Sequence, residues 1–124
     1  MFTYLLVGLW GALGAMARVL LGSLLPATIF ANFPIRIIAV NISGCFVIGL
    51  TAELMELHYA ANSNFRAIFI TGFLGGFTTF SSFALEFAQL TEKNLIINAL
   101  SYVILSVGLG LIAFFIGLKI ARLI

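Results

Sequence analysis

The most informative segment of the chain reads Thr71-Gly72-Phe73-Leu74-Gly75-Gly76-Phe77-Thr78-Thr79-Phe80-Ser81-Ser82-Phe83, in the middle of an uncharged run. Adjacent glycines followed by two β-branched threonines are poor helix formers. A helix that breaks at membrane depth is tolerated only where it is buried in protein or lines a cavity. Freed carbonyls can hold a small cation, and the N-terminus of a half-helix favours an anion. The alternative is a close-packing face, because Gly72 and Gly76 form a small-xxx-small pair.

Composition places this segment in a membrane protein. Of 124 residues, 63% are apolar and 8% charged, whereas a soluble domain carries about 25% charged residues. A spanning helix needs roughly 20 mostly apolar residues, and the apolar runs predict four spans near residues 4–25, 35–57, 66–90 and 95–121. The runs lack the period-2 alternation of barrel strands. We therefore expect an all-α membrane protein that forms one domain over residues 1–124.

The basic residues give almost no orientation signal. Four spans put both termini on one side of the membrane, and Lys and Arg near the span ends favour the cytoplasm. The side with the termini carries Arg66, Lys119 and Arg122, and the other carries Arg36 and Lys93, with Arg18 near its end of the first span. Either one orientation wins by a small margin, or the chain inserts both ways up and pairs head-to-tail about a two-fold axis in the membrane plane.

Two polar side chains inside the predicted spans are candidates for function. Arg18 at a span centre would cost about 2.5–3.5 kcal/mol on insertion scales. It either snorkels to the interface or attracts anions at a water-filled vestibule. Asn41 offers two N–H donors and one acceptor, which suits either joining helices or solvating an ion.

Aromatic and hydroxyl side chains form a second group of candidates. Phe80 and Phe83 are three residues apart and share a helix face, so their positive ring edges can meet an anion; packing or lipid contact is the alternative. In the last span Tyr102, Ser106 and Gly110 form one stripe, which is either a polar track or a packing notch.

Near the end of the third predicted span lies Glu86. Long polar side chains near a span end reach the interface, so we expect this carboxylate to be exposed at the surface.

These segments together resemble the Fluc (CrcB) fluoride channel family over essentially the whole chain. The motif from Thr71 to Phe83 is the most specific match, supported by Gly11-Ala12-Leu13-Gly14-Ala15-Met16-Ala17-Arg18 and Val40-Asn41-Ile42-Ser43-Gly44. The resemblance implies an antiparallel, dual-topology homodimer in the cell membrane, with the third helix broken and two pores along the dimer interface. Its implied function is passive export of fluoride.

The resemblance also assigns residues. Backbone carbonyls of Gly75 and Thr78 would hold a structural sodium ion at the dimer centre. The ion pathway would use Asn41, Phe80, Phe83, Tyr102 and Ser106, with Arg18 at the vestibule. Some members carry a further Ser where this chain has Gly110.

Other functions fit the sequence less well. A small multidrug-type cation exporter needs a buried carboxylate, and the first span has Arg18 and no acid. A non-conducting structural subunit would use its glycines for packing alone. One His, one Cys and no Asp supply no catalytic constellation, so we expect no enzyme, and a net charge of +2 is too small to suggest nucleic-acid binding.

Overall fold

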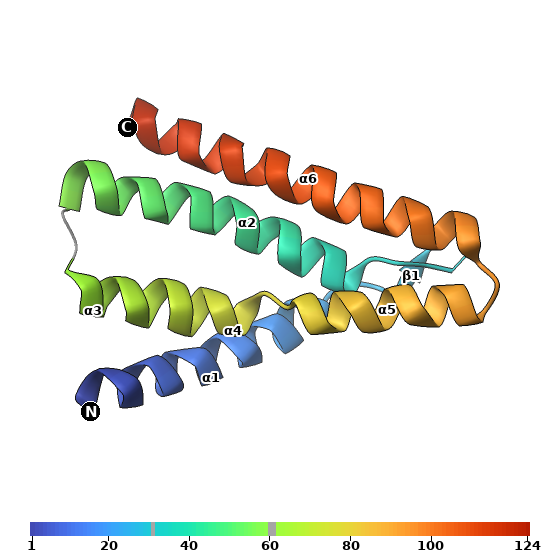
Figure 1. Cartoon of the computed structure of the whole chain (residues 1–124), viewed down its shortest axis with the longest axis horizontal. Helices are drawn as coiled ribbons and strands as arrows, with labels where there is room; N and C mark the ends of the chain where they lie inside the picture. Colours follow the sequence, from blue (N-terminus) through green and yellow to red (C-terminus); the bar gives the residue numbers. More distant parts are fainter. Residues whose placement is uncertain (31, 60–61) are drawn as a thin grey trace.

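The computed structural model describes residues 1–30, 32–59 and 62–124. Four antiparallel helical segments run along a common long axis (Figure 1). In chain order the elements are α1 (Phe2–Ser23), β1 (Thr28–Ile29), β2 (Phe33–Pro34), α2 (Arg36–Leu54), η1 (Met55–Tyr59), α3 (Ser63–Arg66), η2 (Ala67–Leu74), α4 (Gly75–Phe77), α5 (Phe80–Glu92) and α6 (Ile96–Leu123). The two short strands pair antiparallel between α1 and α2.

Four helices are long and apolar enough to cross a membrane, as predicted. They cover Phe2–Ser23, Arg36–Leu57, Ser63–Glu92 and Ile96–Leu123. Both chain ends lie at the same end of the bundle (Figure 1). The chain is therefore an all-α, multi-pass membrane protein.

Glycines bring the helices together in two pairs. A Cβ at Gly49 would collide with the Phe114 carbonyl, and a Cβ at Gly117 would collide with the Phe46 carbonyl. These reciprocal contacts let the backbones of α2 and α6 approach closely, and Figure 1 shows the two helices side by side.

The second pair joins α1 to the first half of the third span. A Cβ at Gly14 would collide with the Phe73 carbonyl, and a Cβ at Gly76 would collide with the Gly11 carbonyl. The small-xxx-small interpretation of Gly72 and Gly76 is thus confirmed, since a Cβ at Gly72 would lie 3.0 Å from the Val7 carbonyl oxygen.

The predicted break of the third helix is also present, and it is confined to the two threonines. Gly75 and Gly76 remain helical in α4, while Thr78 (φ −83°, ψ 159°) and Thr79 (φ −154°, ψ 120°) are extended. The threonines interrupt the helix, and the glycines allow α1 to pack against it. The interruption appears in Figure 1 as the thread between α4 and α5.

Side-chain burial is low for a chain of this length. The core cluster among the described residues consists of Ile38, Leu90, Ala99 and Tyr102. Large apolar side chains on all four long helices remain exposed. Lipid or another protein chain must cover them.

Candidate ion pathway beside the helix break

The two threonines of the break supply hydrogen-bond partners to the two helix ends on either side of it. The Thr78 hydroxyl and backbone N–H both donate to the Leu74 carbonyl, each at 2.9 Å. The Thr79 hydroxyl accepts from the backbone N–H of Ser82 at 3.1 Å and so caps the N-terminus of α5. Side-chain oxygens of this kind replace the partners that a helix end lacks.

Asn41 connects α2 to the same break. Its carboxamide oxygen accepts from the Thr79 N–H at 2.8 Å, and its Nδ2 donates to the Thr79 carbonyl at 2.9 Å. Thr79 is only 8% exposed, so the protein must supply partners for this peptide group. Asn41 therefore joins helices, which was one of the two interpretations of its amide, and one N–H of Nδ2 is left over.

These bonds release two backbone carbonyls. In a continuous helix the Thr79 N–H would donate to Gly75 and the Ser82 N–H would donate to Thr78. Here the first donates to Asn41 and the second to the Thr79 hydroxyl. The carbonyls of Gly75 and Thr78 thus lose their helical donors, and these are the two residues predicted to hold sodium.

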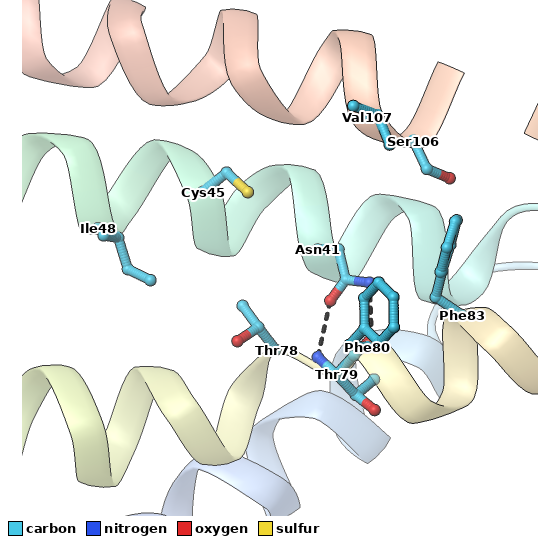
Figure 2. A pocket seen from close by; sticks show the side chains of 9 residues that line it. All are labelled: Asn41, Cys45, Ile48, Thr78, Thr79, Phe80, Phe83, Ser106 and Val107. Carbon is cyan, nitrogen blue, oxygen red and sulfur yellow. Dashed lines mark hydrogen bonds between the residues drawn. The ribbon is translucent and has the colours of Figure 1, made fainter. Parts of the chain in front are cut away.

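An open pocket of about 270 Å³ lies between the break, α2 and α6 (Figure 2). It brings together four of the five predicted pathway residues. Its lining consists of Asn41, Cys45, Ile48, Thr78, Thr79, Phe80, Phe83, Ser106 and Val107. None of these described residues carries a formal charge.

Ser106 contributes the unsatisfied group of this pocket. Its hydroxyl oxygen is buried and has no hydrogen-bond partner among the described residues. A buried hydroxyl without a partner is costly, so a group that enters the pocket would find a free donor there. Cys45 faces the same pocket, and nothing in the sequence distinguished it beyond its position in a span.

Three aromatic rings lie in a row from the pocket into the core. The rings of Phe80 and Phe83 lie 5.5 Å apart, and the rings of Phe83 and Tyr102 lie 5.3 Å apart and nearly parallel. Phe80 is 80% exposed, whereas Tyr102 is completely buried. Phe80 and Phe83 therefore contact each other, as their spacing predicted.

Tyr102 does not line the pocket directly. It lies behind Phe83, and its hydroxyl donates to the Glu86 carboxylate. The expectation that Glu86 is an exposed surface carboxylate was wrong, because this side chain is partly buried and holds Tyr102 across the α5–α6 contact. A 16-residue separation gives no local signal for this pairing.

Arg18 lies in a different pocket from the other predicted residues. That pocket, of about 530 Å³, is also lined by Arg36, Ser81 and Ser82. The start of α5 separates it from the uncharged pocket: Ser81 and Ser82 face Arg18, while Phe80 and Phe83 face Asn41. The sequence did not predict that Arg36 would join Arg18.

Comparison with known proteins identifies the family. The family model described as "CrcB-like protein, Camphor Resistance (CrcB)" matches residues 5–118. A protein of Rhizobium etli (strain CFN 42), named "Fluoride-specific ion channel FluC", is 43% identical over 122 residues, which is 98% of both chains. A protein of the same name from Helicobacter pylori (strain G27) is 41% identical over 123 residues, 98% of this chain and 94% of that one. The chain therefore belongs to the CrcB family.

Proposed function

We propose that this chain forms a fluoride-selective channel in the cell membrane, through which fluoride leaves the cell passively. The names of its relatives support transport of fluoride. The observation that carries the proposal is the uncharged pocket beside the helix break, in which Asn41 and the unpartnered Ser106 hydroxyl place hydrogen-bond donors within a mainly apolar lining. A channel needs such a lining because ions must leave as easily as they enter.

The chemistry of this pocket suits a small anion. Fluoride holds its water tightly, so a pathway must replace that water with several donors. Asn41 has one N–H left after bonding to Thr79, Ser106 has its hydroxyl, and Phe80 and Phe83 offer positive ring edges. No cation lies in the described lining to trap the ion.

Two copies of the chain would enclose the pathway. Phe80 is 80% exposed, and the pocket beside it is open on one side. A second copy covering this face would bury Phe80 and close the pocket, giving one pore for each chain along the interface. The near-equal distribution of basic residues between the two ends leaves both orientations in the membrane open, as an antiparallel, dual-topology homodimer requires.

A structural sodium ion would bind at the break. Carbonyl oxygens suit hard cations, and the carbonyls of Gly75 and Thr78 have lost their helical donors. Bound there, the ion would supply a fixed positive charge that joins the breaks of two chains. Asn41 and the threonine hydroxyls would hold the backbone in the extended form that turns these carbonyls away from the helix.

The remaining predicted residues would act around this pathway. Arg18 would raise the anion concentration at its mouth. Tyr102, fixed by Glu86, would support the ring of Phe83 from behind and keep its edge directed into the pathway.

The alternatives make different demands on the chain. A cation exporter would need an acid in the first span, and α1 contains none. A structural subunit would pass no ion, so it predicts no flux from the intact protein.

Efflux from liposomes separates these functions. Purified protein in liposomes loaded with potassium fluoride should release fluoride when a potassium ionophore is added, while chloride-loaded liposomes should retain their anion. Equal release of both anions would exclude fluoride selectivity, and release of neither would favour a structural subunit. Prolonged removal of sodium should abolish fluoride release; undiminished release without sodium or any substitute ion would contradict the sodium site.

A further inference from the structure

Two open pockets meet at the C-terminal end of α1 and share Val19 and Ser23. One is lined by Arg18 and Arg36. The other, of about 550 Å³, is mainly apolar and follows one face of α1 past Met16 and Leu20. We propose that an anionic phospholipid binds across both pockets, with its phosphate between the two arginines and one acyl chain along α1.

Arg36 is held in place at the phosphate end of this site. Its Nε donates to the Leu25 carbonyl at 2.9 Å, just beyond the end of α1. Gly22 lies beside the Arg36 side chain, because a Cβ at Gly22 would lie 3.9 Å from Arg36 Cβ. With Nε occupied, the four terminal N–H donors of the guanidinium remain for a ligand.

Arg18 adds a second charge without a protein partner. Among the described residues it makes no hydrogen bond or ion pair, whereas Arg66 and Arg122 pair with Glu56 and Glu53 at the opposite end of the bundle. None of the described residues lining the pocket is acidic. Two like charges that face one cavity repel each other, and a phosphate would compensate both through charge-assisted hydrogen bonds.

The pocket reaches from the span ends toward the helix break. Ser23 ends the first span and Arg36 begins the second, while Ser81 and Ser82 lie just after the break. A headgroup would therefore enter at the end of the pocket formed by Ser23 and Arg36. Arg18 is one and a half turns farther in, about 7.5 Å along the helix axis. A long side chain can cover that distance and present its charge at the interface.

The apolar pocket favours a lipid over a free anion. The side chains of Met16, Val19 and Leu20 are each more than 60% exposed, and they lead from the charged pocket along α1. An inorganic anion would use the arginines and leave this face uncovered. A phospholipid matches both pockets at once, since its acyl chain begins where its phosphate ends.

Binding of short-chain phosphatidylglycerol and phosphatidylcholine to the full-length protein in neutral detergent, measured by native mass spectrometry, tests this site. Both lipids carry a phosphate, but the choline cation of phosphatidylcholine would be repelled by the two arginines, so phosphatidylglycerol should bind about tenfold more tightly. Arg36→Gln should remove this preference. Lys93→Gln, which removes the same charge at the same end of the bundle outside the pocket, should leave it intact.

Each other outcome would overturn the proposal. Equal binding of the two lipids would exclude a site for an anionic phospholipid. An equal loss of the preference for phosphatidylglycerol in Arg36→Gln and Lys93→Gln would indicate diffuse electrostatic attraction to this end of the protein. A free-anion site would be indicated if sodium sulfate displaced phosphatidylglycerol completely and raised the thermal midpoint of the protein as much as phosphatidylglycerol does. Should Arg36→Gln fold poorly, Arg36→Lys, which keeps the charge but loses the Leu25 bond, should retain part of the preference, and full retention would contradict the proposed geometry.

These measurements do not depend on conduction. A channel that conducts fluoride but lacks a lipid preference would refute only the lipid site, and a lipid-binding protein that conducts nothing would refute only the proposed function. Where both hold, the phosphate would weaken the attraction of Arg18 for free fluoride, a consequence that rests on the proposed function.

Discussion

Asn41 and Thr79 are joined by two hydrogen bonds that run in opposite directions between α2 and the helix break. The carboxamide supplies an acceptor for the N–H that no longer reaches Gly75, and it adds a donor to the Thr79 carbonyl. Side chain and main chain thus pair much as two neighbouring strands do. The interruption of the third span is therefore fixed in a single geometry by a helix 38 residues away in sequence.

Replacing Asn41 by Ala should loosen the break and stop transport. The variant loses both bonds and leaves a buried N–H without a partner, which should lower the free energy of unfolding by about 2–3 kcal/mol. Thermal unfolding in detergent and fluoride efflux from liposomes would measure both effects. Ser43→Ala is the matched control, because the Ser43 hydroxyl donates to the Val40 carbonyl within α2 and takes no part in the contact with the break. A variant at position 41 as stable as the Ser43 control would show that the paired bonds contribute little.

Thr79 should tolerate Ser but not Val. Valine keeps the shape of threonine and removes the hydroxyl that caps α5, so the free energy of unfolding should fall by about 0.5–2 kcal/mol. Serine keeps the hydroxyl and should stay within a few tenths of a kcal/mol of the native value. If Thr79→Val melts like the native protein and Thr79→Ser melts below it, the β-branched shape matters at this position and the cap does not.

Gly76 and Gly108 provide a test of close packing. A Cβ at Gly76 would meet the backbone of Gly11, whereas a Cβ at Gly108 would have nothing within 4 Å. Alanine is the better helix former at both positions by about 0.5–1 kcal/mol, so Gly108→Ala should be neutral or stabilising. Gly76→Ala should lower the thermal midpoint and separate α1 from the third span, which crosslinking between these helices would detect. Equal midpoints would mean that α1 can move away at no cost.

The sequence located the break because its cause is local. Two β-branched threonines after two glycines are a weak helix whatever surrounds them, and the structure interrupts the helix at Thr78 and Thr79. The sequence did not predict that Gly75 and Gly76 stay helical. Their small size serves contact with α1, and this contact depends on how two distant helices pack.

Partners distant in sequence account for the other differences. Nothing near Glu86 indicates that its carboxylate accepts from Tyr102, and nothing near Arg36 indicates that it faces Arg18. Helix periodicity assigns a residue to a face, but the element that covers this face is fixed by tertiary packing. Tyr102 and Ser106 share one face of α6 but have different surroundings: Ser106 lines the pocket, and Tyr102 lies behind it.

Ser106→Ala should separate stability from transport. The native hydroxyl is buried without a partner among the described residues, and such a group costs about 1–3 kcal/mol of desolvation. Its removal should leave the thermal midpoint unchanged or raise it. Fluoride efflux should nevertheless fall about tenfold, the size expected when an ion loses one hydrogen-bond donor.

Ser101→Ala, on the same helix but outside the pocket lining, should change neither the thermal midpoint nor the fluoride efflux. A structural role for Ser106 predicts the opposite pattern, in which the midpoint falls and the efflux per folded protein is preserved. Because the two roles move the two measurements in different directions, one pair of variants distinguishes them.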